Sequence, residues 1–374
     1  MNLAEQRRPV GAPPKPPSTE SFGMHIVVLP GDGIGPEIAA VTVAAVEAVS
    51  KKFNLGITLE HDVTGLEGFK RHGKTVTPEL VKKIEAADGF ILGPTDTYVY
   101  KGDGQINPSM FFRKHLDLYA NIRPARTYPG VPARVNPFDL VVVRENTEGF
   151  YADRNMASGG SEMLVTPDVV VSLRRITRHC CERIARAGFE LAQRRRKKVT
   201  LVHKANVLKI GDGLFLDVCR EVGKSFPEVA VDEYIVDAMM AHVVRAPEKF
   251  DVIVTTNMFG DILSDLTAEL SGSIGLGGSV NAGASHAMAQ AAHGSAPDIA
   301  GQDIANPFSL ILSAALLLDW HGRRKNLPAF NQAARAMEQA TVDAVAAHEA
   351  TGDIGGKLGT KATGAIFAKR IRAA

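Results

Sequence analysis

Short runs of β-branched and other apolar residues alternate with longer amphipathic stretches along the chain. The first run, 25–29, ends at Pro30, and the stretch 36–53 that follows carries apolar residues at helical spacing after an initial Pro36. The same alternation continues through the runs 57–63, 90–92, 140–144, 199–202, 231–236 and 252–255. Alternation of this kind predicts an α/β fold in which helices cover a largely parallel sheet.

Composition excludes several classes of protein. The 43 Lys and Arg residues nearly balance 41 Asp and Glu, and a net charge of +2 gives no field that would attract nucleic acid or an anionic membrane. No apolar run approaches the roughly 18 residues that a membrane-spanning helix needs. The cysteines, Cys180, Cys181 and Cys219, fit neither a disulfide framework nor a zinc site. We therefore expect a cytoplasmic protein with reduced thiols, built as two domains or one large one.

The segment 1–22 differs from the rest of the chain. It holds five of the 20 prolines and almost no apolar residue, so it cannot bury enough surface to offset the entropy lost on ordering. We expect a disordered tail without a catalytic role. The density of proline also argues against a helical mitochondrial presequence, and the lack of an apolar core argues against a secretory signal.

Two motifs resemble binding sites for nucleotides or nucleic acids. The turn Gly31–Gly35 follows a predicted strand, but its G-x-G-x-G spacing differs from the G-x-G-x-x-G of a Rossmann site. A tight strand-to-helix turn is the simpler interpretation. The basic run 194–198 precedes a strand and contains no aromatic residue, so we interpret it as a solvated loop.

Three arginines suggest a site for carboxylates. Arg144 ends an apolar strand, where a charge is costly unless it binds an anion, and Arg113 and Arg123 lie upstream of it. Their guanidinium groups could hold substrate carboxylates through paired hydrogen bonds. The alternative is internal salt bridges to acids such as Glu145 or Asp117.

Acidic residues further along the chain suggest a metal site that would complement these arginines. Asp261 and Asp265 lie four residues apart at the start of a predicted helix, 260–271, and Asp237 ends a predicted strand. These carboxylates suit a divalent cation, although acids in a first helical turn also stabilise the helix dipole. Lys204 follows another strand and is either a rim charge or a base with a lowered pKa. Together, arginines for carboxylates, aspartates for a cation and a lysine as a base are suited to the activation of a 2-hydroxy acid.

Six motifs in a fixed order identify a family that the chain resembles. The chain is similar from about Met24 to its C-terminus to the β-decarboxylating dehydrogenases, which include isocitrate, 3-isopropylmalate and homoisocitrate dehydrogenases, with tartrate enzymes as relatives. The motifs are GDGIGPEI from Gly31, DLYANIRPAR from Asp117, VVVRENTEGFY from Val141, HKANVLK from His203, TTNMFGDILSDL from Thr255 and HGSAPDIAGQDIANP from His293.

The resemblance implies a two-domain isocitrate/isopropylmalate dehydrogenase-like α/β fold with parallel and mixed sheets, which is not a Rossmann fold. A large domain on the cofactor side would combine 23–119 with 271–374, and a small central domain would span 120–270 with a dimerisation arm at 153–165. The expected partner is a second copy of the chain. Lys204 and Asp237 would enter the neighbouring subunit's site, and no membrane or nucleic-acid partner is expected.

The resemblance also implies an activity and its residues. We expect NAD-dependent and Mg²⁺- or Mn²⁺-dependent oxidative decarboxylation of a 3-carboxy-2-hydroxy acid. Lys204 would be the base and Tyr151 the donor of a proton to carbon, and Asp237, Asp261 and Asp265 would bind the metal. Arg113, Arg123 and Arg144 would bind carboxylates. The expected cofactor-binding residues are Asn206, His293, Gly294, Ser295, Ala296, Pro297, Asp298, Ile299 and Asn306.

Cofactor choice depends on Asp298, which can accept hydrogen bonds from both ribose hydroxyls and would repel a 2′-phosphate. NADP-dependent relatives have Lys and Tyr where this chain has Asp298 and Ile299, so the chain resembles the NAD-dependent members. One departure from many relatives is Gln290, which stands where they have Glu.

Substrate choice depends on the residues before Arg113. Asn107 and Ser109 are the Asn and Ser of isocitrate enzymes with their positions exchanged, which favours isocitrate, the precursor of 2-oxoglutarate. Met110 would allow the apolar pocket of a 3-isopropylmalate enzyme, which is the next candidate. The non-enzyme alternative is a regulatory subunit of the same fold, which should lack one of the catalytic groups that this chain retains.

Overall fold

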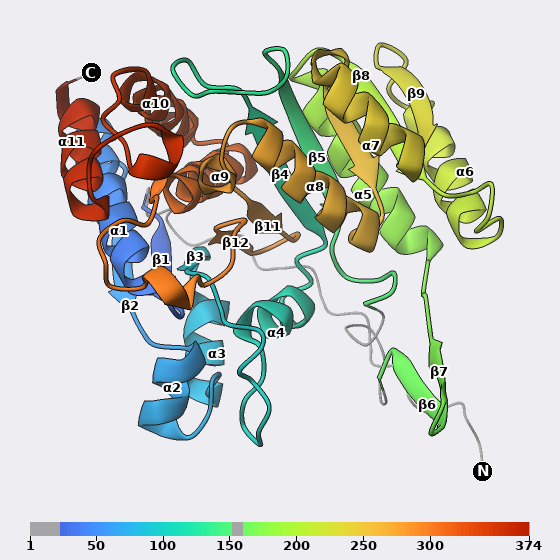
Figure 1. Cartoon of the computed structure of the whole chain (residues 1–374), viewed down its shortest axis with the longest axis horizontal. Helices are drawn as coiled ribbons and strands as arrows, with labels where there is room; N and C mark the ends of the chain where they lie inside the picture. Colours follow the sequence, from blue (N-terminus) through green and yellow to red (C-terminus); the bar gives the residue numbers. More distant parts are fainter. Residues whose placement is uncertain (1–22, 152–159, 374) are drawn as a thin grey trace.

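A computed structural model describes residues 23–151 and 160–373, and within them the main feature is a ten-stranded mixed sheet (Figure 1). The strand order is β2-β1-β3-β12-β11-β4-β5-β10-β8-β9. The expected tail 1–22 and residues 153–159 of the expected arm lie outside the described residues. None of the helices described is long and apolar enough to cross a lipid bilayer.

Parallel pairing forms both ends of the sheet. At one end β1 (His25–Leu29) lies between β2 (Thr58–His61) and β3 (Gly89–Leu92), and β12 (Ala287–Gln290) runs parallel to β3. At the other end, parallel pairs join β5 (Asp139–Glu145) to β10 (Val252–Thr255), β10 to β8 (Lys198–His203) and β8 to β9 (Ala230–Ile235). The β1 and β10 ranges match the sequence-based prediction, and β2, β3, β5, β8 and β9 agree with it to within a few residues, whereas β12 is not predicted.

Antiparallel strands join these two ends, so the expectation of a largely parallel sheet is wrong at the centre. β4 (Ala120–Arg126) is antiparallel to β5, and β11 (Val280–Ala282) is antiparallel to both β4 and β12. β11 pairs only with Ala120 to Ile122, so Pro124 lies where β4 has no partner on that side. This placement explains how a proline is accommodated in a strand near the middle of the sheet.

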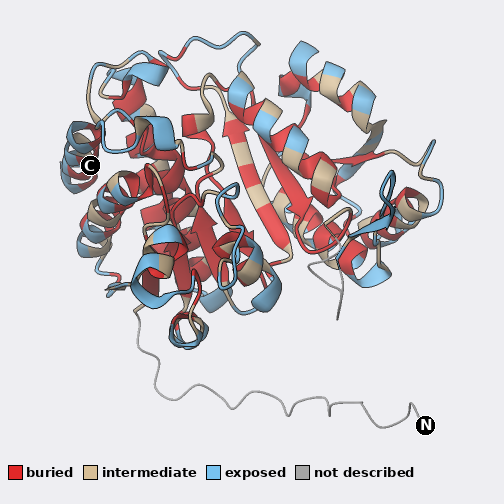
Figure 2. Ribbon diagram, turned by 60° about the horizontal axis from the view of Figure 1, so that its bottom comes forward, coloured by how far each residue is buried: buried red, intermediate tan, exposed pale blue. Residues whose placement is uncertain are grey.

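Helices cover both faces of the sheet, and the alternation of side chains along each strand divides the core between the faces. Ile26 and Val28 of β1 pack on one face, whereas Val27 and Leu29 pack on the other. Figure 2 shows the buried strands between helices whose outer surfaces are exposed. The first of these faces is covered by α1 (Gly35–Phe53), α9 (Phe308–Lys325), α10 (Pro328–Ala346) and α11 (Thr360–Ala373), and the second by α3 (Pro78–Ala86) and α4 (Pro108–His115).

The other end of the sheet repeats this layering. Val141 and Val143 of β5 pack under α5 (Arg178–Gln193) and α6 (Gly211–Gly223). Leu140 and Val142 pack on the opposite face against α7 (Val236–Arg245) and α8 (Asn257–Leu270). Within the described residues, the remaining helical segments are α2 (Gly65–His72) and 3₁₀ turns at Pro247–Lys249, Ile274–Leu276, Pro297–Ile299 and Gly352–Ile354.

Three local expectations need correction. Asp237 does not end a strand, because β9 stops at Ile235 and Asp237 lies in the first turn of α7. Helix α8 begins at Asn257, three residues before the predicted start. The basic run is not merely solvated, since Arg195 Nε donates a hydrogen bond of 2.7 Å to the buried carboxylate of Asp251.

A separate pair of strands, β6 (Glu162–Thr166) and β7 (Val169–Ser172), projects from the body of the molecule (Figure 1). β6 contains the described end of the expected dimerisation arm. Every residue of both strands is exposed, among them Leu164 and Val170. Apolar side chains in such an isolated hairpin do not pack into any core that the described residues form.

Candidate active site

Arg144 is the centre of the first group of predicted site residues. It lies at the end of β5 and is only 1% exposed. Its Nε and Nη2 donate to Asn257 Oδ1 at 3.0 and 2.7 Å, and its Nη1 donates to Asp261. Thr255 of the adjacent β10 pairs with Arg144, so a helix that begins two residues later places its first turns beside the guanidinium. Gly260 permits this approach, because a Cβ there would lie 2.6 Å from Arg144 Cγ.

Arg123 completes this group from β4. It is 8% exposed, and its Nη1 donates to Ser264 Oγ at 2.8 Å and to Asp265 Oδ1 at 3.2 Å. The same nitrogen lies 3.4 Å from Asp261 Oδ1. We call the four residues Arg123, Arg144, Asp261 and Asp265 the Arg–Asp cluster. Neither Arg123 nor Arg144 forms the expected alternative bridge to Asp117, whose carboxylate pairs with Arg183 at 2.6 Å.

The carboxylates of the Arg–Asp cluster are not helix-dipole partners. The first turn of α8 contains no acid, because the helix starts at Asn257. Burial raises the pKa of Asp265; Arg123 opposes that shift and the neighbouring carboxylate of Asp261 adds to it. The neighbouring carboxylates of Asp261 and Asp265 would gain from an added cation between them, and such oxygens are the ligands that Mg²⁺ and Mn²⁺ prefer. The residues therefore fit a divalent metal.

A second group lies on the same face of the sheet and connects α4 with β12. Ser109 Oγ and Arg113 Nη2 both donate to Gln290 Oε1, at 2.9 and 3.0 Å. Ser109 and Gln290 are buried. Asn107 instead caps α4, since its Oδ1 accepts a hydrogen bond from Met110 N at 3.1 Å. The sequence marks Gln290 only as a departure from relatives, and it gives no separate signal for Asn257 or Ser264.

Lys204 and Asp237 form a third group. They follow the adjacent parallel strands β8 and β9, and Lys204 Nζ donates to the carboxylate of Asp237. This hydrogen bond holds the pKa of Asp237 below its ordinary value. Asn206 is exposed just beyond Lys204, and Tyr151 is the last described residue before the gap at 152–159.

The three predicted metal ligands are not together in one chain. In residues 23–151 and 160–373, no three His, Cys, Asp or Glu side chains are arranged to hold a metal ion. Asp261 and Asp265 belong to the Arg–Asp cluster, whereas Asp237 contacts Lys204.

The expected cofactor loop is fixed by the glycine-rich turn after β1. Ile34 N donates to Ser295 O at 2.9 Å. Gly33 has φ +58° and a Cβ there would meet Ser295 O at 1.9 Å, so only glycine allows this contact. Asp298 is exposed in a short 3₁₀ turn beyond it. The turn therefore supports the loop, as a tight strand-to-helix connection.

The two ends of the predicted cofactor segment are also held in place. Asn306 Nδ2 donates to Asp353 Oδ2 at 2.9 Å, and its Oδ1 accepts from Phe308 N. The ring nitrogen Nδ1 of His293 lies 3.0 Å from Gly294 O, and burial lowers the pKa of this histidine. A neutral imidazole can accept or donate a hydrogen bond without adding charge to the loop.

Comparison with known proteins shows the family to which the chain belongs. The family model described as isocitrate/isopropylmalate dehydrogenase matches residues 25–369. The chain belongs to the isocitrate/isopropylmalate dehydrogenase family. It is 40% identical over 336 residues to a 3-isopropylmalate dehydrogenase from Archaeoglobus fulgidus, an alignment that covers 90% of this chain and 95% of the relative. An isocitrate/homoisocitrate dehydrogenase from Thermus thermophilus is 41% identical over 339 residues, covering 90% and 96%.

A solved structure supports the same assignment of the fold. The crystal structure of isocitrate dehydrogenase from Methylococcus capsulatus matches with a TM-score of 0.83 and 37% identity, over 93% of this chain and 99% of that one. The expected isocitrate/isopropylmalate dehydrogenase-like fold is thus confirmed, and membership of the family makes the chain a decarboxylating dehydrogenase.

Proposed function

We propose that this family member carries out NAD-dependent, metal-assisted oxidative decarboxylation of a 3-carboxy-2-hydroxy acid, with isocitrate as the favoured substrate and 2-oxoglutarate as its product. The observation that carries the proposal is the Arg–Asp cluster, in which buried guanidinium groups lie beside two carboxylates on one helix face. Arginines bind the carboxylates of such a substrate, and aspartates suit a cation that contacts its hydroxyl.

Arg113, Arg123 and Arg144 hold the substrate in this proposal, and their donors fix its carboxylates. Arg144 is itself fixed by two hydrogen bonds to Asn257, and Arg123 by its bond to Ser264. Because these partners orient the guanidinium groups before substrate arrives, less entropy is lost on binding. Asp261 and Asp265 would hold Mg²⁺ or Mn²⁺ together with Asp237.

Two residues move protons. Lys204 removes the proton of the 2-hydroxyl as the hydride leaves C2, which yields a 2-keto acid. The β-carboxylate then leaves as CO₂, its bonding electrons remain as an enolate, and Tyr151 protonates the carbon. When bound, the cation supplies positive charge that polarises the hydroxyl and keto oxygens, and NAD supplies the hydride acceptor. Asp298 and Asn306 hold the adenosine part of NAD, and Asn206 helps to orient it.

The site needs a homodimer in this proposal, with Lys204 and Asp237 of each chain completing the other chain's site. This arrangement accounts for the separation of Asp237 from the Arg–Asp cluster within one chain. The exposed apolar strands β6 and β7 are suited to pack against a second copy. We also propose a cytoplasmic location, in which the thiols of Cys180, Cys181 and Cys219 stay free, as they are in this structure.

The polar side chains of Ser109, Arg113 and Gln290 beside α4 favour isocitrate over 3-isopropylmalate as the substrate. The hydroxyl of Ser109 and the guanidinium of Arg113 converge on Gln290, and these donors suit the third carboxylate of isocitrate better than an isopropyl group. 3-Isopropylmalate remains the alternative because Met110 is 37% exposed beside Ser109 and could contact an apolar group. A regulatory subunit is disfavoured because Lys204, Tyr151 and the three aspartates are all retained.

A substrate panel tests this proposal. Initial rates should be measured with isocitrate, homoisocitrate, 3-isopropylmalate and tartrate, each with NAD and Mn²⁺. We expect the largest kcat/KM with isocitrate. A larger value with 3-isopropylmalate would overturn the substrate assignment and leave the chemistry intact, and no turnover with any of the four would overturn the proposed activity.

Cofactor preference gives a separate prediction. The carboxylate of Asp298 should repel the 2′-phosphate of NADP, so kcat/KM for NAD should exceed that for NADP by at least about tenfold, or ~1.4 kcal/mol. Asp298→Asn should lower the ratio of kcat/KM for NAD to that for NADP. Asp303→Asn, which changes a half-buried acid in the same region, should leave this ratio unchanged. Equal efficiency of the wild-type enzyme with both nucleotides would contradict the role of Asp298.

A further inference from the structure

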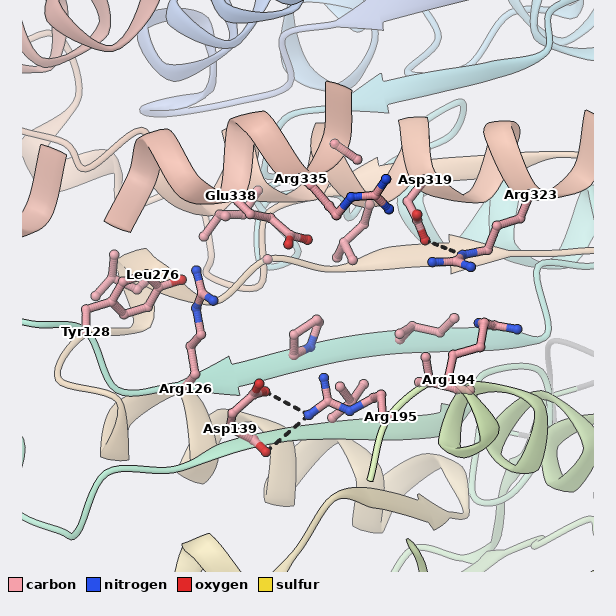
Figure 3. A pocket seen from close by; sticks show the side chains of 18 residues that line it. Arg126, Tyr128, Asp139, Arg194, Arg195, Leu276, Asp319, Arg323, Arg335 and Glu338 are labelled. Carbon is pink, nitrogen blue, oxygen red and sulfur yellow. Dashed lines mark hydrogen bonds and ion pairs between the residues drawn. The ribbon is translucent and has the colours of Figure 1, made fainter. Parts of the chain in front are cut away.

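A cavity of about 250 Å³ lies on the face of β4 and β5 that is opposite the Arg–Asp cluster (Figure 3). Ile122, Pro124 and Arg126 of β4 line it, whereas Arg123 between them faces Asp265 on the other side. β5 shows the same alternation, with Asp139 and Val141 at the cavity. The cavity and the candidate active site are thus separate, and they share two strands.

The rest of the cavity lining comes from distant parts of the sequence. Helices α9 and α10 supply Asp319, Arg323, Arg335 and Glu338, and the end of α5 with the loop after it supplies Arg194 and Arg195. Figure 3 shows these side chains on both sides of the opening. Apolar side chains complete the lining, among them Leu191, Leu276, Leu312 and Leu316.

The cavity holds more positive than negative charge. It contains five arginines and three acids, and two of the arginines are paired: Arg195 with Asp139 at 2.8 Å and Arg323 with Asp319 at 2.6 Å. Arg126 stacks on Tyr128, with its guanidinium carbon 4.9 Å from the ring centre. These contacts account for three of the five arginines.

Arg194 and Arg335 are the two that remain. Neither side chain has a hydrogen bond or an ion pair with any residue that the structure describes. Both side chains are exposed, and partial desolvation together with the charge of Arg323 facing it lowers the pKa of Arg194. The third acid of the lining is Glu338; burial raises its pKa, and the charges that oppose this shift are those of Arg126 and Arg195. A bound anion would relieve this excess of positive charge, since guanidinium groups pair with carboxylates and phosphates.

We propose that this cavity is a second binding site, distinct from the active site, for a small ligand that carries a phosphate or carboxylate group on an apolar body. Arg194 and Arg335 bind the anionic group, and the leucines of the lining contact the apolar part. A ligand held in this way joins α5 and β4 of the central segment to α9 and α10 of the C-terminal segment. It also contacts the strands whose other face carries Arg123 and Arg144, which offers a physical route for an effect on the active site.

Isothermal titration calorimetry in metal-free buffer tests the proposal. The probes are phenyl phosphate, phthalate and inorganic phosphate, titrated into the wild-type protein and into Arg194→Ala and Arg335→Ala. We expect phenyl phosphate or phthalate to bind once per chain, inorganic phosphate to bind more weakly, and each substitution to raise the dissociation constant of the bound probe at least tenfold. The better probe of the first two identifies phosphate or carboxylate as the recognised group.

Two controls separate the cavity from other anion sites. Lys197→Ala removes an exposed charge from the same basic run without changing the lining, and Arg113→Ala alters the candidate active site. Both should bind the probe as the wild type does. The proposal is overturned if no probe binds the wild type, if Arg194→Ala and Arg335→Ala bind as tightly as the wild type, or if Arg113→Ala alone abolishes binding.

Discussion

At the scale of single residues, the buried charge of Arg144 shows how neighbouring side chains prepare the site. A guanidinium as enclosed as that of Arg144 carries a large desolvation cost unless its donors are satisfied, and here Asn257 and Asp261 satisfy them. The same contacts fix the direction of the side chain. Arg144 is therefore held in one orientation before any substrate binds, which is the condition for selective binding of a carboxylate.

Loss of the proposed base is the first test at this scale. Lys204→Met should lower kcat by roughly 10²–10⁴-fold, since a positioned acid–base group contributes about that much, while the circular dichroism spectrum and melting temperature stay close to those of the wild type. Lys209→Met changes an exposed lysine in the same motif and should retain full activity. A Lys204→Met enzyme with more than about a tenth of the wild-type kcat would assign the base to another residue.

Substrate choice gives a second test. Ser109→Leu removes the hydroxyl that donates to Gln290 and adds apolar surface, so binding of a third carboxylate should weaken by on the order of 1–3 kcal/mol. The ratio of kcat/KM for 3-isopropylmalate to that for isocitrate should rise at least about tenfold. Ser109→Ala, which only removes the hydrogen bond, should produce a smaller rise. An unchanged ratio in Ser109→Leu would show that this residue does not contact the variable group of the substrate.

At the scale of helices and strands, the geometry of the site depends on how closely a helix can pack against a strand. Helix α8 can lie against β5 because Gly260 has no side chain to clash with Arg144. Helix α5 approaches β10 in the same manner, since a Cβ on Gly188 would lie 2.2 Å from Cγ2 of the buried Val254. Tight packing of this kind has no room for an added methyl group unless the helix or strand moves.

Two glycine substitutions test this packing. Gly188→Ala should destabilise the protein by about 1–3 kcal/mol, the usual cost of overpacking a core. Gly213→Ala in α6 should stabilise it by about 0.5–1 kcal/mol, because the new Cβ would have no atom within 4 Å beyond its chain neighbours and its own helix backbone, and alanine favours a helix. The measurement is the free energy of unfolding from urea titrations of both variants. The free energy of unfolding should fall in Gly188→Ala and rise in Gly213→Ala. A fall of similar size in both variants would contradict the difference in packing between the two positions.

At the scale of the whole molecule, the proposed active-site residues are distributed over both ends of the sheet. We propose that 23–119 with 271–374 and 120–270 form its two domains, because each end of the sheet has its own clusters of buried apolar side chains on both faces. The Arg–Asp cluster lies near the antiparallel strands that join these ends, while Lys204 and Asp237 lie at the far side of the sheet. A dimer would bring these groups of separate chains together.

Heterodimers with two different defects test whether the sites are shared. Lys204→Met and Arg113→Ala should each be nearly inactive alone. If Lys204 acts in the neighbouring chain's site, a heterodimer purified with two affinity tags has one intact site and should show about half of the wild-type kcat. If Lys204 acts in the site of its own chain, both sites of the heterodimer carry a defect and activity should stay at the level of the single variants.

The sequence alone determined the α/β class, the strands β1 and β10, the family, and the residues of the Arg–Asp cluster. It could do so because these features depend on local pattern or on a motif within a few neighbouring residues: a buried parallel strand is a run of β-branched residues, and a charge at its end is visible in the sequence.

Only the tertiary structure decided the centre of the sheet, the true start of α8 and the role of Gln290. β11 has only three residues (Val, Asn, Ala) and β12 only four (Ala, Met, Ala, Gln), and β4 contains Pro124. Their propensity for strands is therefore weak, and pairing with neighbours forms them. Gln290 became a partner of Ser109 and Arg113 because β12 brings it to α4 from 181 and 177 residues away. The arginine-lined cavity likewise exists only where α9 and α10 meet β4, since no local pattern reports which distant side chains will face one another.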